Sequence, residues 1–87
     1  MEDIERVLRA LVNVRRLAIL KYLKKEKEAT VGEIAKNINL SFKATSKHLG
    51  ILANADILQK EQRSLQMWYR ISSKLHYLAK YISNSRE

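Results

Sequence analysis

The spacing of hydrophobic residues changes close to Asp56 in this chain of 87 residues. Before that point apolar residues recur every three or four positions, which is the spacing of an amphipathic helix. After it, residues 57–63 and 66–71 alternate between apolar and polar, which is the spacing of a half-buried strand. From Ser73 onward the helical spacing returns. This order predicts a mainly α fold with one small β-hairpin, as a single domain over residues 1–87.

Polar capping residues divide the first part of the chain into four helices. Asn13 can cap the second helix, after a first helix that ends near residue 12. Thr30 opens a T-x-x-E capping box, so the third helix is expected to start at Val31 and to run for about two turns. Asn39 can adopt the left-handed conformation that ends this helix, and Ser41 can cap the fourth. The third and fourth helices therefore form a tight helix-turn-helix.

The expected hairpin has an unusual connection. Its two strands are separated by Ser64 and Leu65, and neither residue is a glycine. Two-residue hairpin loops favour glycine because they need positive φ angles. The loop is thus either a two-residue turn without glycine or a longer, irregular one.

The chain is strongly basic, with 17 Lys and Arg against 9 Asp and Glu, a net charge of +8 and a pI of about 10.0. Such an excess attracts polyanions such as nucleic acid, although a basic surface can also be merely solvated. The fourth helix favours the first interpretation, because its two faces differ. Thr45, Leu49 and Leu52 share the buried face, and the opposite face carries cationic and small polar residues without acids: Lys43, Ala44, Ser46, Lys47, His48 and Gly50.

Several classes of protein are not expected. The chain has no cysteine, which excludes disulfides, thiolate metal sites and cysteine nucleophiles, and neither histidine is placed with acids at catalytic spacing, so we do not expect an enzyme. No apolar run approaches the length of a membrane span, and the first residues are acidic where a signal peptide would be basic. We expect a soluble, cytoplasmic protein.

Six short segments in a fixed order resemble the ArsR-type winged helix-turn-helix regulators, over roughly residues 11–71. They are N-V-R-R-L-A-I-L at 13–20, E-I-A at 33–35, L-S at 40–41, T-S-K-H-L-G-I-L at 45–52, A-D-I-L at 55–58 and W-Y-R-I at 68–71. The chain departs from the family pattern at Val14, where proline is usual, and at Asn39 and Asp56, where glycine is usual. Asn and Asp tolerate left-handed backbone, so the fold is expected to survive these changes.

The resemblance implies a homodimeric, sequence-specific regulator of double-stranded DNA, most often a repressor. The DNA-binding residues are expected to be Ser41, Lys43, Ala44, Ser46, Lys47 and His48 on the fourth helix, with Lys60 and Arg63 near the tip of the hairpin, or wing. His48 could instead be a surface histidine without a role, and Lys60 and Arg63 could be ordinary solvated charges. The alternative function is a winged-helix module that contacts protein or RNA.

The first and last helices form the dimer interface in the resemblance. Their apolar residues here are Ile4, Val7, Leu8 and Leu11 in the first helix and Leu75, Leu78 and Ile82 in the last. Metal sensors of the family carry thiolates on the third helix or His, Asp and Glu clusters on the last. This chain has no cysteine, and the neighbours of His76 one turn later, Ala79 and Lys80, cannot bind metal. We therefore expect no metal site and no cofactor, and the sequence leaves an inducer open.

Overall fold

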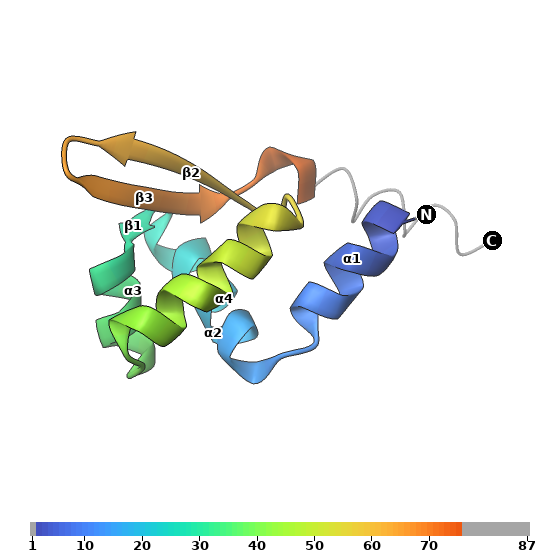
Figure 1. The fold of residues 1–87 in the computed structure, drawn as a ribbon, viewed down its shortest axis with the longest axis horizontal. Coiled ribbons are helices and arrows are strands. Elements are labelled where there is room, and N and C mark those ends of the chain that lie inside the picture. The colour runs from blue at the N-terminus through green and yellow to red at the C-terminus, as the bar shows by residue number, and fades with distance from the viewer. Residues whose placement is uncertain (1, 76–87) are drawn as a thin grey trace.

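The computed structural model of the protein describes residues 2–75 (Figure 1). The elements are α1 (Glu2–Leu11), α2 (Val14–Glu26), β1 (Ala29–Thr30), α3 (Val31–Ile38), α4 (Phe42–Asn54), β2 (Leu58–Arg63) and β3 (Gln66–Ile71). The hairpin of β2 and β3 covers one side of the helices, and α1 lies at the end of the molecule away from the hairpin tip (Figure 1). This is a winged helix-turn-helix, as the sequence predicts.

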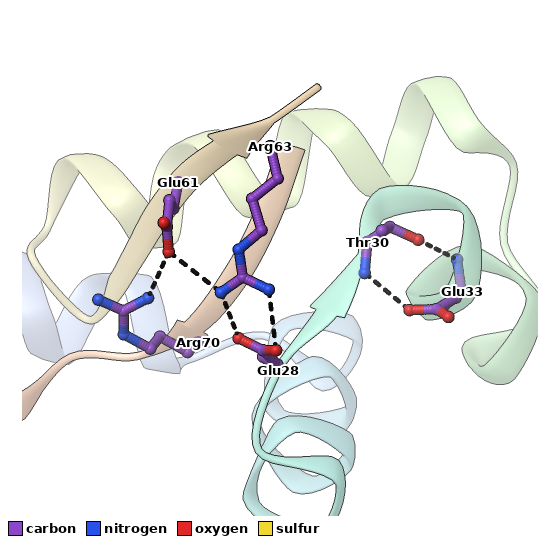
Figure 2. A network of polar contacts seen from close by, with 6 residues as sticks. All are labelled: Glu28, Thr30, Glu33, Glu61, Arg63 and Arg70. Carbon is purple, nitrogen blue, oxygen red and sulfur yellow. Dashed lines mark hydrogen bonds and ion pairs between the residues drawn. The ribbon is translucent and has the colours of Figure 1, made fainter. Parts of the chain in front are cut away.

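The predicted helix caps are confirmed. Asn13 accepts a hydrogen bond from the backbone N–H of Arg16 at 3.0 Å, and Ser41 accepts one from Ala44 at 3.1 Å. Both bonds of the capping box at the start of α3 are present (Figure 2). Asn39 ends α3 with a φ of 57°, in the left-handed region. These local hydrogen bonds fix where α2, α3 and α4 begin.

The departures from glycine are accommodated in the backbone. Asp56 follows α4 with a φ of 61°, so an aspartate adopts the left-handed conformation for which glycine is usual. Arg63 pairs with Gln66, so the hairpin loop is a two-residue turn and not a longer one. Ser64 is the first of the two turn residues and has a positive φ of 57°. A type II′ turn requires a positive φ at this position.

The sheet contains one strand more than the sequence predicts. β1 pairs antiparallel with β3, which gives a three-stranded sheet in the order β1-β3-β2. A strand of two residues between α2 and α3 shows no periodicity, so the sequence gives no sign of it. Its effect is to join the middle of β3 to the segment that leads into α3.

A single core holds these elements together. Ile19 and Leu23 of α2, Ile34 of α3, and Leu49 and Leu52 of α4 have 1% or less of their surface exposed. Two large apolar side chains on these helices lie outside the core: Phe42 is 63% exposed and Leu17 is 51% exposed. Among residues 2–75, no helix is long and apolar enough to cross a bilayer.

The predicted last helix lies mostly beyond the described range. Residues 73–75 are helical and Leu75 packs against the core. Leu78 and Ile82, which the sequence assigns to the dimer interface, lie outside the described residues.

Candidate nucleic-acid interface

The two faces of α4 are as different in the structure as in the sequence. Thr45, Leu49 and Leu52 are fully buried. On the other side Lys43, Ser46 and Lys47 are exposed, with Ala44 partly exposed, and the helix carries no acidic residue. Ser41 is exposed at the N-terminal end, where unpaired N–H groups and the helix dipole favour a negatively charged group. This side of α4 therefore offers short polar and cationic groups of the kind that contact DNA in a major groove.

His48 lies differently from its predicted neighbours. It is partly buried, and its Nδ1 is 3.2 Å from Nη1 of Arg16 on α2. Because a guanidinium can only donate, Nδ1 accepts this bond and the ring is neutral, with its proton on Nε2. Burial, and then the positive charges of Arg16, Lys47 and Arg15, lower the pKa of His48. His48 is thus held against α2, and only Nε2–H of its polar groups is left for another partner.

Arg16 is itself fixed in place. Its Nε donates to the carbonyl oxygen of Ala10 at 2.6 Å, while its backbone N–H bonds the cap residue Asn13. Arg16 therefore connects the end of α1, the start of α2 and α4. The sequence predicted no role for Arg16, because its partners are revealed only by the packing of the three helices.

The wing carries two predicted phosphate contacts that differ in the structure. Lys60 is exposed in the middle of β2, opposite Tyr69, and not at the tip. Arg63 is next to the turn, but two hydrogen bonds of 2.9 and 2.7 Å bind its guanidinium to the carboxylate of Glu28 (Figure 2). It also donates to Glu61 at 3.1 Å and lies 4.9 Å from the centre of the Trp68 ring.

These contacts give Arg63 a second role beside the predicted one. Its charge faces two carboxylates and it fastens the wing to the segment before β1, while its contact with phosphate stays a prediction. The hydrogen bonds from Arg63 are also the main reason why the pKa values of Glu28 and Glu61 are lowered. Arg70 completes the network with a bond to Glu61 of 3.4 Å (Figure 2). Sequence reasoning missed Glu28 and Arg70, since nothing in their local sequence indicates a partner on the wing.

The residues assigned to the dimer interface divide into two groups. Val7 is only 3% exposed and belongs to the core of the single chain, which leaves it almost no surface for the interface assigned to it. Leu8 is 50% exposed, and Ile4, Leu11 and Leu75 are partly buried. The exposed apolar surface continues past the end of α1 to Val12 and Val14, each 80% exposed, which the sequence analysis did not assign.

Within residues 2–75 no three His, Asp or Glu side chains come together in a way that could hold a metal ion. The site described so far is a surface of hydrogen-bond donors and positive charges, without a nucleophile or a catalytic acid–base pair. Its chemistry is that of binding polyanions.

Residues 13–60 match the sequence profile of the bacterial regulatory proteins of the arsR family. This match covers more than half of the chain and includes α2, the helix-turn-helix and the start of the first strand of the wing. The chain belongs to the ArsR family. The family and the fold are those of DNA-binding transcriptional regulators.

Several solved structures of bacterial proteins are similar to the chain over nearly its whole length. The homodimeric winged helix-turn-helix DNA-binding domain from Mycobacterium bovis has 26% identity and a TM-score of 0.79, covering 95% of this chain and 80% of that one. The transcriptional repressor PagR of Bacillus anthracis has 26% identity and a TM-score of 0.77, covering 93% of each chain. NolR from Sinorhizobium fredii has 28% identity and a TM-score of 0.76, and the match covers 98% of this chain and 85% of NolR. No curated protein matches the chain significantly in sequence.

Proposed function

We propose that this member of the ArsR family binds double-stranded DNA sequence-specifically as a homodimer and represses transcription. The observation that carries the proposal is the exposed side of α4, on which Lys43, Ser46 and Lys47 stand together without any acidic residue. Base edges in the major groove are read by short polar and cationic side chains of this kind. The net charge of +8 supplies the general attraction to the phosphate backbone.

Different residues of this surface perform different tasks in the proposal. Ser46 and Lys47 contact base edges, and the Nε2–H of His48 adds one donor beside them. Lys43, Lys60 and the N-terminal end of α4 at Ser41 bind phosphates and set the position of the protein on the duplex. Ala44 leaves room for the sugar-phosphate backbone or a thymine methyl group.

The dimer is supported by exposed apolar surface and by similarity. Leu8 is half exposed on α1, and a monomer gains nothing from leaving it in water. The similar domain from Mycobacterium bovis is described as homodimeric. The repressor role is supported in the same way, since PagR is described as a transcriptional repressor. Control by a metal is not part of the proposal, because the chain has no cysteine.

Selection of bound duplexes from a random pool tests the proposal. A dimer with two α4 helices should select an inverted repeat whose half-sites lie about 10 to 11 bp apart, or a multiple of this distance. A pool without any enriched sequence, or tighter binding to single-stranded RNA of the same length at the same salt, would contradict it.

A further inference from the structure

A cleft with a positive lining lies between α1, α2 and α4, on the α1 side of the recognition helix. Its volume is about 440 Å³, and it is lined by Glu5, Arg6, Arg9, Ala10, Arg16 and Ile51. Volumes of this order are typical of sites for small molecules. Three guanidinium groups and one carboxylate give the lining a net charge of +2.

The three arginines of the cleft use only some of their N–H donors in hydrogen bonds within the protein. A guanidinium has five N–H groups and cannot be deprotonated in a protein. Arg6 makes one long bond of 3.5 Å to the carbonyl oxygen of Asn54, and Arg9 bonds Glu5 at 2.9 Å on an exposed surface. Arg16 uses its Nε and one Nη1 bond, on Ala10 and His48. Within the described residues, the other N–H groups of these three side chains have no protein acceptor.

Guanidinium groups bind carboxylate and phosphate oxygens in pairs, through two parallel hydrogen bonds. We propose that the cleft between α1, α2 and α4 binds a small multivalent oxyanion, a metabolite that carries two phosphate or carboxylate groups. Arg6, Arg9 and Arg16 bind its oxygens, and Ile51 and Ala10 provide the apolar floor. The binding step does not depend on the DNA-binding function proposed above.

An anion bound in the cleft affects the recognition helix through Arg16, because Arg16 both lines the cleft and contacts His48 on α4. The positive charges of Arg16, Arg15 and Lys47 disfavour protonation of His48. An oxyanion on Arg16 offsets part of that field, so it raises the pKa of His48 towards the ordinary value of 6.5. It also competes for the N–H groups that hold the imidazole ring against α2. A bound anion therefore changes the protonation and position of a side chain on the proposed DNA surface.

The test is an NMR titration of the DNA-free protein with sodium pyrophosphate, against sodium chloride at matched ionic strength. We expect saturable shifts of the Nε–H signals of Arg6, Arg9 and Arg16 at one equivalent of bound anion, with a higher pKa for His48 in the loaded protein. Shifts that rise linearly, or that sodium chloride reproduces, would overturn the proposal. A pKa of His48 that is unchanged at saturation would overturn the link to α4.

Paired variants separate the cleft from general basic surface. Arg6→Gln with Arg9→Gln should weaken pyrophosphate binding by about tenfold or more, because charge-assisted hydrogen bonds are lost. Lys24→Gln with Lys25→Gln removes the same charge from the exposed far end of α2 and should leave binding nearly unchanged. Equal losses in the two double variants would overturn the proposal.

The cleft could instead bind phosphates of the DNA backbone. The salt dependence of DNA binding distinguishes this from binding of a small anion. If Arg6 and Arg9 bind a small anion, their double variant keeps the wild-type salt dependence of binding to random duplex. A fall in the salt slope by about one unit per lost contact would assign the cleft to the DNA interface and would overturn a small-molecule site.

Discussion

Arg16 on α2 donates a hydrogen bond to Nδ1 of His48 on α4, across a distance of 3.2 Å. The two residues are 32 positions apart in the sequence and join two helices, α2 and α4. The bond requires a neutral imidazole, because both nitrogens of a protonated ring are donors.

This bond predicts a dependence of stability on pH. The pKa of His48 is lower in the folded protein than its ordinary value of 6.5, so the unfolded chain takes up the proton first as the pH falls. Stability is therefore full above 6.5, falls as the pH drops towards the folded pKa, and levels off below it. Urea unfolding at about pH 7.5 and about pH 5.5 should show a larger loss for the wild type than for His48→Asn. Equal losses in the two proteins would contradict the prediction.

Replacing threonine by valine should change the free energy of unfolding in opposite directions at two buried positions. Thr45 is fully buried, and its hydroxyl has no hydrogen-bond partner among the described residues, whereas the hydroxyl of Thr30 accepts the capping bond of α3. Thr45→Val should raise the free energy of unfolding by about 1 kcal/mol, since it removes an unpaired polar group. Thr30→Val should lower it by about 1 kcal/mol, since it removes a cap. Urea unfolding measures both, and a destabilised Thr45→Val would show that this hydroxyl has a partner in solution.

The features that could be predicted from the sequence are those decided within a few residues. The caps at Asn13, Thr30 and Ser41 depend on side chains that bond N–H groups three positions later. The buried face of α4 follows from helical spacing alone. The same local chemistry explains why Asp56 replaces a glycine without a change of fold.

The features that could not be predicted depend on residues far apart in the chain. The bond of Arg63 to Glu28 spans 35 positions, and no property of either segment indicates it. The pairing of Ala29 with Tyr69 also needs the tertiary arrangement before it becomes visible. The apolar stripe of α1 placed Val7 and Leu8 together, yet only the packing decides that Val7 is buried and Leu8 is exposed.

The wing provides a prediction that separates Lys60 from Arg63. Lys60→Ala should reduce the salt slope of binding to random duplex by about one unit per contact, because Lys60 is exposed and has no carboxylate partner among residues 2–75. Arg63→Ala should leave that slope nearly unchanged and should alter the fluorescence of Trp68, the only tryptophan, over which the guanidinium lies. A slope that falls for Arg63→Ala as much as for Lys60→Ala would restore Arg63 as a phosphate contact.

The dimer interface provides the next prediction. Leu8→Glu should shift the protein from dimer to monomer at micromolar concentration, because a charge on the exposed apolar side of α1 would have to be buried between subunits. Gln59→Glu makes the same change of charge at an exposed position on β2 and should sediment like the wild type. A wild-type protein that sediments as a monomer, or a Leu8→Glu variant that remains a dimer, would contradict the proposed interface.

The most direct test of the account is the ratio of affinities for the selected operator and for random duplex. It is measured for the wild type and for a variant in which Ser46 and Lys47 are replaced by alanine. If α4 reads base edges, Ser46→Ala with Lys47→Ala should cost about 1 to 3 kcal/mol on the operator and much less on random duplex, so the ratio falls. Lys24→Ala, which removes one positive charge at the far end of α2, should leave the ratio unchanged. A double variant that keeps the wild-type ratio would show that α4 is not the recognition helix.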